Sequence, residues 1–148
     1  MRILAAEDDP TSQQVMVEMF RLKPEWHFEV VDSAAFAWWK LTDPEIDRYD
    51  LLITDLRIPN GSGLDLLRRV RSDRQTSSLK VLICSANKDR EVMVQMIKQG
   101  TSDYILKPYI PREMLQKVGS ILADVPHRRI DLALGTEGGD EVAVGSQG

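Results

Sequence analysis

The sequence has 148 residues, of which 43% are hydrophobic and 28% charged, and its net charge is −4. This length and composition fit one globular domain with a single hydrophobic core. The balance of 19 basic against 23 acidic side chains argues against sequence-independent nucleic-acid binding, which needs a basic face, and no apolar run is long enough to cross a membrane.

The compartment is indicated by the N-terminus and by the single cysteine. The first nine residues, MRILAAEDD, are charged by position 7 and lack the apolar core of a secretion signal. Cys84 is the only cysteine and cannot form an internal disulfide, which fits a reducing environment. We therefore expect a cytoplasmic protein.

Five short apolar runs alternate with helical patterns along the chain. The runs have the composition of strands, and they are RILAA (2–6), FEVV (28–31), LLIT (51–54), KVLIC (80–84) and DYIL (103–106). Near-continuous apolar strands that alternate with helices predict a parallel sheet covered on both faces, which is a doubly wound α/β fold.

The first helical pattern follows the run 2–6. Apolar residues at Val15, Met19 and Leu22, with Met16 and Phe20 beside them, predict its buried face. Pro10 suits its first turn, and Thr11 with Gln14 forms a candidate capping box.

Four more helical patterns follow. They are SAAFAWWKL (33–41), with Ser33 as its expected N-cap, then LDLLRRV (64–70), the apolar residues between 92 and 97, and those between 114 and 122. Gly100 suits the end of the fourth helix. Trp38 and Trp39 point about 100° apart on a helix, so only one of them should be well buried.

The last stretch of the chain differs in composition from the rest. From Asp131 onward it contains five of the nine glycines, four acids and no Lys or Arg. Such a composition is typical of a flexible terminus or a linker. We therefore predict a domain over residues 1–124 and an acidic, Gly-rich tail or linker stub over residues 125–148.

Polar side chains follow four of the predicted strands at their carboxyl ends, where doubly wound folds place their ligand sites. The acids Glu7, Asp8 and Asp9 follow the first strand; single residues follow the third, fourth and fifth, and these are Asp55, Ser85 and Lys107. We expect these groups to converge at one edge of the sheet.

The chemistry of this set indicates phosphoryl transfer. Neighbouring carboxylates repel one another, and Mg²⁺, which is commonly held by carboxylates and a phosphate, would relieve that repulsion. Lys107 supplies a point charge for a phosphate oxygen and Ser85 a hydroxyl, so that charge on a transferring phosphoryl group is stabilised. Asp55 is the candidate nucleophile, because a carboxylate can form an acyl phosphate.

These motifs together resemble the receiver domain of bacterial two-component response regulators, in particular the chemotaxis-type single-domain members. The motifs are the acidic pair after the first strand, ITDLRIPNGSG around Asp55, CSA after the fourth strand and DYILKP around the fifth. The separations also agree, with 30 residues from Asp55 to Ser85 and 52 from Asp55 to Lys107. The resemblance covers roughly residues 1–124.

The resemblance implies a flavodoxin-like (βα)5 fold with strand order 2-1-3-4-5. It implies that Asp55 accepts a phosphoryl group from the phosphohistidine of a sensor kinase or a phosphotransfer protein, and that Lys107 contacts that group. It also implies a Mg²⁺ site formed by Asp8, Asp9, Asp55 and the backbone carbonyl of Arg57, and a cis bond between Lys107 and Pro108.

The resemblance further implies a switch rather than a classical enzyme, with self-catalysed phosphorylation and dephosphorylation. Ser85 would move toward the phosphoryl group, and Tyr104 would change its burial. The face formed by residues 88–100, the run 103–106 and the last helix would then bind a partner or form a homodimer. No direct contact with nucleic acid or membrane is expected.

The sequence departs from the family pattern in the loop after Asp55. Many members carry an acid before the last glycine of this loop, and Ser62 stands in that place. Ser85 replaces the more frequent threonine but keeps the hydroxyl.

Two other hypotheses remain. One is a docking module that works without phosphorylation. The other is an aspartate-nucleophile phosphohydrolase, which usually has a second acid two residues after the nucleophile, where this chain has Arg57. Neither His27 nor His127 lies in a phosphodonor-like motif, and both are expected at the surface.

Overall fold

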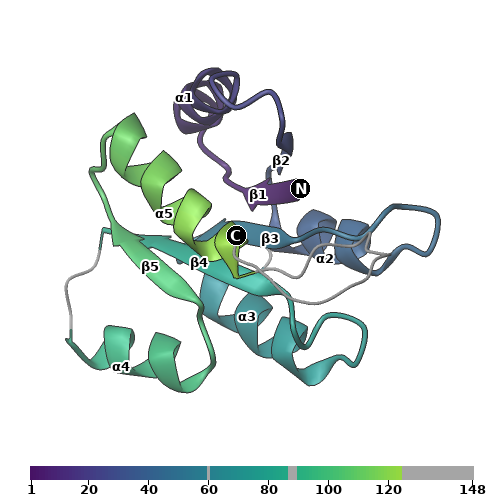
Figure 1. The fold of residues 1–148 in the computed structure, drawn as a ribbon. Helices are drawn as coiled ribbons and strands as arrows, with labels where there is room; N and C mark the ends of the chain where they lie inside the picture. The colour runs from purple at the N-terminus through teal and green to yellow at the C-terminus, as the bar shows by residue number, and fades with distance from the viewer. Residues whose placement is uncertain (60, 87–89, 125–148) are drawn as a thin grey trace, which may run out of the picture.

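The computed structural model describes residues 1–59, 61–86 and 90–124, which form a parallel sheet between two layers of helices (Figure 1). The strands are β1 (Arg2–Ala6), β2 (His27–Val31), β3 (Leu51–Asp55), β4 (Lys80–Ser85) and β5 (Asp103–Leu106). The helices are α1 (Pro10–Phe20), α2 (Ala34–Thr42), α3 (Gly63–Ser72), α4 (Arg90–Lys98) and α5 (Pro111–Ala123).

The sheet has the strand order β2-β1-β3-β4-β5, and all its pairs are parallel. This order confirms the predicted doubly wound, flavodoxin-like fold. The chain runs outward from β1 to β2 and then crosses back to β3 on the other side of β1. The order reverses at β1 and β3, and in such folds ligands bind at the carboxyl ends of the strands where this happens.

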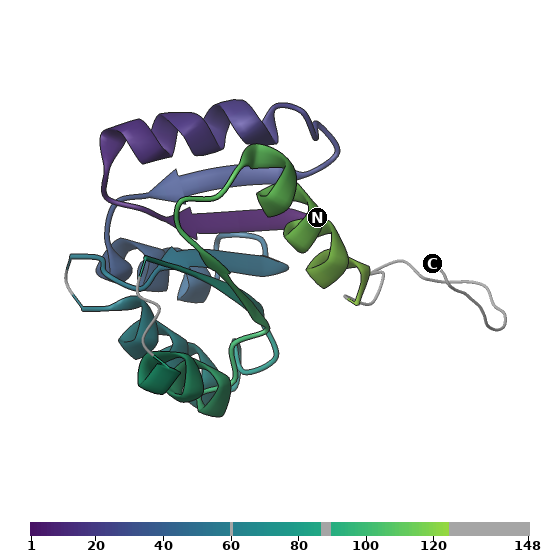
Figure 2. The ribbon, with the colours of Figure 1, turned by 90° about the vertical axis from the view of Figure 1, so that its left-hand side faces the viewer.

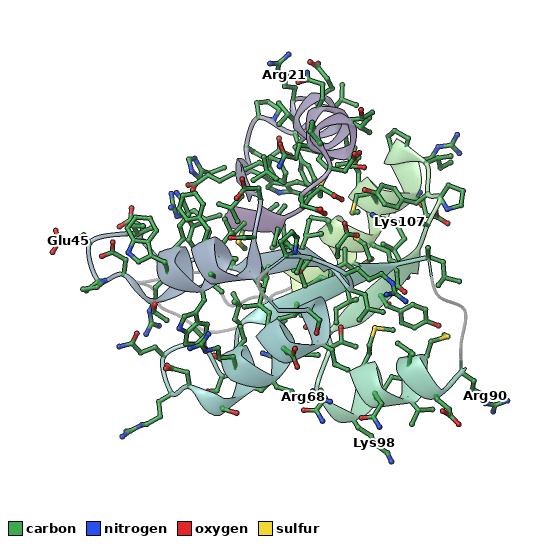
Figure 3. The ribbon with its side chains drawn as sticks, turned by 180° about the vertical axis from the view of Figure 1, so that it is seen from behind. Arg21, Glu45, Arg68, Arg90, Lys98 and Lys107 are labelled. Carbon is green, nitrogen blue, oxygen red and sulfur yellow. The ribbon has the colours of Figure 1, made fainter. Side chains whose placement is uncertain are left out.

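The two faces of the sheet have separate cores because successive side chains of a strand point to opposite faces. In β1, Leu4 and Ala6 pack with α2, α3 and α4, whereas Ile3 and Ala5 pack with α1 and α5. Figure 3 shows the arrangement from behind, with Arg21 beyond the end of α1 and Lys98 at the end of α4 on opposite sides of the sheet.

The first helix lies differently from its predicted orientation. Its buried residues are Met16, Met19 and Phe20, and the predicted core residues Val15 and Leu22 are 46% and 70% exposed. The predicted capping box is also wrong, because the N-cap of α1 is Asp9 and its carboxylate accepts the bond from the Ser12 N–H.

Several local predictions are confirmed. Ser33 caps α2 by accepting a hydrogen bond from the Phe36 N–H at 3.0 Å. Gly100, just past α4, has a φ of 87°, which favours glycine. Trp39 is 52% exposed while Trp38 packs against the core.

Two expectations concern the chain as a whole. Among residues 1–59, 61–86 and 90–124, no helix is long and apolar enough to cross a membrane. The predicted tail, residues 125–148, lies outside the described residues, as does His127.

Candidate functional site

Asp55 and Lys107 form the centre of the site. Asp55 is the last residue of β3 and is only 8% exposed, and its Oδ1 lies 2.6 Å from the Lys107 Nζ. Lys107 follows β5 and is held by its own backbone N–H, which donates to the Ser85 carbonyl at 2.9 Å. The Lys107–Pro108 bond is cis, as the resemblance implied.

An acidic cluster surrounds this pair. Carboxylate oxygens of Glu7, Asp8 and Asp55 all lie within 4.8 Å of one another, so that the three residues could hold a metal ion. Glu7 is 4% exposed, and its Oε1 lies 3.4 Å from the Lys107 Nζ. The side chains at the carboxyl ends of β1, β3 and β5 therefore converge at one edge of the sheet, as predicted.

Asp9, which was expected among the metal ligands, lies outside this cluster. Its carboxylate accepts hydrogen bonds from the Ser12 N–H at 2.8 Å and the Ser12 hydroxyl at 2.9 Å. The hydrogen bond from the Ser12 backbone is the main reason that the pKa of Asp9 is lowered. Asp9 thus caps α1, and Glu7 lies in the carboxylate cluster where Asp9 was predicted.

A local signal could have identified Glu7. Pro10 is the first residue of α1, and proline is favoured at that position. An acid directly before such a proline is well suited to be the N-cap. The capping role of Asp9 leaves Glu7 and Asp8 as the pair at the strand end.

Burial and the neighbouring charges shift the pKa values of both Asp55 and Lys107, in a way that suits the binding of a cation. The pKa of Asp55 is raised to about 7, mainly by burial and also by the neighbouring Glu7, against the lowering effect of Lys107. Burial is the largest single effect on Lys107 and would lower its pKa, but the hydrogen bond to Asp55 and the negative charges of Asp55 and Glu7 together raise it. A divalent cation among these carboxylates would favour their ionised forms.

The other predicted residues lie around this centre. Ser85 is the last residue of β4, one position beyond the residue that pairs with Asp55, and is 3% exposed. Arg57 lies in the loop after β3, where it forms an isolated bridge with Ser62. Tyr104 in β5 is half-buried and packs against the core on the α4 side of the sheet.

The loop after Asp55 is fixed by the start of α3. Ser62 is the N-cap of α3 and accepts a hydrogen bond from the Asp65 N–H at 3.0 Å. Gly63 lies so close to the end of β3 that a Cβ atom would fall 2.2 Å from the Asp55 carbonyl oxygen. Ser62, which departs from the family pattern, therefore has a structural role as a helix cap.

Comparisons with known proteins agree with this geometry. The chain is 35% identical over 108 residues to the two-component response regulator ORR24 of Oryza sativa subsp. indica, a match that covers 73% of this chain and 16% of the rice protein. It is 29% identical to the chemotaxis protein CheY1 of Helicobacter pylori, with 82% of this chain and 97% of that protein covered. The chain thus spans a small part of the rice regulator but nearly the whole chemotaxis protein.

A solved structure shares the fold as well. A putative response regulator from Chloroflexus aurantiacus superposes with a TM-score of 0.74 and 27% identity, over 82% of this chain and 97% of that one. The family model for the response regulator receiver domain matches residues 3–119. With these matches and the converging acids and lysine, the chain belongs to the response regulator receiver domain family of two-component signalling.

Proposed function

We propose that this protein is a signalling switch in which Asp55 accepts a phosphoryl group from the phosphohistidine of a sensor kinase or phosphotransfer protein. The observation that carries the proposal is the buried Asp55 carboxylate, which contacts Lys107 at 2.6 Å and lies in one cluster with Glu7 and Asp8. Membership of the response regulator receiver domain family, a family of phosphoacceptor switches, supports this proposal.

The transfer step is a nucleophilic substitution at phosphorus. A carboxylate oxygen of Asp55 forms a bond to phosphorus while the phosphorus–nitrogen bond of the donor breaks, and the donor imidazole leaves with the electron pair and takes up a proton. Lys107 is placed to contact the transferred group because its ammonium already lies beside the accepting carboxylate. Hydrolysis by water would later return Asp55 to its free form.

Glu7, Asp8 and Asp55 would hold Mg²⁺, together with the backbone carbonyl of Arg57. The donor set is purely oxygen, which suits this ion. When bound, Mg²⁺ would neutralise charge on the phosphoryl oxygens. The chain's own carboxylates supply the charge that attracts the ion, and Glu7 also fixes Lys107 from the other side.

The output of the switch would be the face made by α4, β5 and α5. Ser85 and Tyr104 lie on the neighbouring strands β4 and β5, and Tyr104 packs against the core cluster that contains Met96 of α4. On α4, Val94 and Ile97 are 40% and 62% exposed, so this helix presents apolar side chains for a partner or a second copy of the chain. Phosphorylation of Asp55 would change the affinity of that face.

The first experiment is intact-mass analysis after incubation with Mg²⁺ and acetyl phosphate, beside the Asp55→Asn variant. We expect one added phosphoryl group that requires Mg²⁺ and is absent from the variant. Beryllofluoride, which mimics the bound phosphoryl group, would then be expected to bind the wild type. Failure of both reagents would support the alternative of a docking module that works without phosphorylation.

An exposed groove offers a place for the phosphodonor to dock. It is lined by residues of α1 and the start of α5, namely Pro10, Thr11, Gln14, Val15, Glu18, Met19, Leu22 and Pro111. Two of these residues, Pro10 and Pro111, closely follow the acidic cluster and Lys107 in the chain. A helical protein bound over the exposed Val15 and Leu22 would therefore bring its histidine toward Asp55.

This docking is tested by comparing two phosphodonors. In the variant Leu22→Asp, transfer from a sensor kinase that phosphorylates the wild type should slow, because a charge interrupts the apolar groove. Phosphorylation by acetyl phosphate should not change, since that donor needs no docking surface. Ile97→Asp on α4 is the matched control and should leave both reactions unchanged; equal loss in both variants would refute this docking site.

A further inference from the structure

The backbone carbonyl group of Glu7 belongs to the peptide that joins two residues of the acidic cluster, Glu7 and Asp8. Figure 2 shows the chain leaving the tip of β1 and turning into the start of α1, and Glu7 and Asp8 lie in this short connection. The Glu7 N–H still continues the sheet by donating to the Val31 carbonyl at 2.9 Å. Its carbonyl has left the strand ladder and needs a donor from elsewhere.

Gln13 supplies that donor. Its side-chain amide, in the first turns of α1, reaches back so that Nε2 donates to the Glu7 carbonyl oxygen at 2.6 Å. The Glu7 side chain is held on the other side, because its Oε2 accepts the Asp9 N–H at 3.0 Å. The sheet therefore fixes the peptide group before Glu7, and the hydrogen bond from Gln13 fixes the peptide group that joins Glu7 to Asp8.

We propose that Gln13 is a positioning residue for the metal-binding acids, acting through the Glu7 carbonyl rather than by contact with the ion. This inference rests on the proposed function of the cluster. The direction of the Glu7–Asp8 peptide sets where the Asp8 carboxylate lies relative to Glu7 and Asp55, whose oxygens lie within 4.8 Å of one another. Groups that orient metal ligands in this way contribute strongly to metal affinity.

The next residue in the chain provides a matched control. Gln14 has the same side chain on the same helix, but its Nε2 donates to Glu18 Oε2 at 2.9 Å on the exposed surface of α1. Replacing either glutamine with methionine keeps the length of the side chain and suits a helix. Only Gln13→Met removes the donor from the Glu7 carbonyl.

The test measures Mg²⁺ binding by calorimetry in the chain of 148 residues, together with the melting temperature without Mg²⁺. We expect Gln13→Met to weaken Mg²⁺ binding about tenfold, the lower end of the effect of ligand-orienting groups, and Gln14→Met to leave it unchanged. Acetyl phosphate should then phosphorylate Gln13→Met at the wild-type rate once Mg²⁺ is saturating, because Asp55 and Lys107 are untouched.

Two results would overturn the inference. One is wild-type Mg²⁺ affinity in Gln13→Met, and the other is equal weakening in Gln14→Met. Failure of the proposed function would look different, since the wild type would bind Mg²⁺ without forming an Asp55 adduct, and the calorimetric comparison of the two variants would still decide the role of Gln13.

Discussion

At the scale of single residues, Asp55 is unfavourable to the fold when no metal is bound. Its pKa is raised from its ordinary value of 3.8 to about 7, mainly by burial. Between these values the unfolded chain has released the proton and the folded chain has kept it. The contribution of Asp55 to the free energy of unfolding therefore falls as pH rises from about 4 to 7, and stays low above that range.

Replacing Asp55 with asparagine should therefore stabilise the Mg²⁺-free protein at pH 8, with a gain that shrinks toward pH 4. The gain should be on the order of 4 kcal/mol at most, because the pKa of Asp55 is raised from 3.8 to about 7 and each pH unit between these values corresponds to about 1.4 kcal/mol. Urea unfolding in EDTA across this pH range measures it. Parallel stability curves for the two proteins would contradict the burial argument, and the exposed Asp65→Asn serves as the control.

Gly63 has no room for a side chain because its backbone lies against the end of β3. A Cβ atom there would lie 2.2 Å from the Asp55 carbonyl oxygen, whereas at Gly119 in α5 it would meet no atom within 4 Å. We expect Gly63→Ala to destabilise the fold by roughly 3 kcal/mol, since the backbone must shift. Gly119→Ala should stabilise it by about 0.5–1 kcal/mol. Thermal unfolding compares the two, and equal effects would contradict the contact.

The choice among the three acids after β1 shows what residue types alone do not reveal. Asp55 and Lys107 come together as predicted, because strand ends in a parallel sheet meet at one edge. Glu7, Asp8 and Asp9 are consecutive, however, so an assignment that is wrong by one residue confuses a proposed metal ligand with a helix cap. The structure resolves this because the Asp9 carboxylate is already bound to Ser12.

At the scale of elements, α1 shows why the orientation of a helix is harder to predict than its existence. This region has apolar residues at Val15, Met16, Met19, Phe20 and Leu22, more than one face of a helix can bury. Spacing alone does not choose between two overlapping faces. Packing chooses, because Phe20 stacks on Phe28 of β2 with ring centroids 4.2 Å apart.

Arg71 joins α3 to the end of α4. Its guanidinium donates to the Gly100 carbonyl from Nε at 3.0 Å and from Nη2 at 2.7 Å, and Nη1 donates to the Leu79 and Ser77 carbonyls at 2.6 and 3.2 Å. Two connecting segments, the one between α3 and β4 and the one between α4 and β5, are therefore held by one side chain. Carbonyl groups at a helix end also attract a positive charge.

Arg71→Met should lower the free energy of unfolding by roughly 2 kcal/mol, because hydrogen bonds from a charged group are among the stronger ones. Arg68→Met, three residues earlier, removes only an exposed pair with Asp65 at 3.1 Å and should change stability little. Chemical denaturation of both variants measures the difference. Similar losses in the two variants would show that Arg71 does not join these elements.

At the scale of the whole molecule, the doubly wound fold class was predictable because alternating strands and helices with right-handed crossovers leave few arrangements. The strand order followed from the resemblance to one family, which rests on the motifs around Asp55, Ser85 and Lys107 and on their separations. The side chains that complete the site were less predictable. The closeness of Glu7 to Asp55 depends on how β1 packs beside β3, and the place of Gln13 depends on how α1 begins.

The stability of the whole fold offers a test of which acids bind Mg²⁺. An ion that binds only the folded state stabilises it by about 1.4 kcal/mol at ten times its dissociation constant, which corresponds to roughly 5 °C in melting temperature for a domain of this size. Asp8→Asn should abolish this Mg²⁺-dependent increase, because Asp8 belongs to the carboxylate cluster.

Asp9→Ala should behave in the opposite way. Its loss removes the cap of α1 and lowers the melting temperature both with and without Mg²⁺, but the increase on adding Mg²⁺ should remain. The opposite result would be an increase in melting temperature with Mg²⁺ that disappears in Asp9→Ala and persists in Asp8→Asn. It would show that Asp9 binds the metal ion and Asp8 does not. The two variants therefore separate a ligand from a helix cap at adjacent positions, through a property of the entire fold.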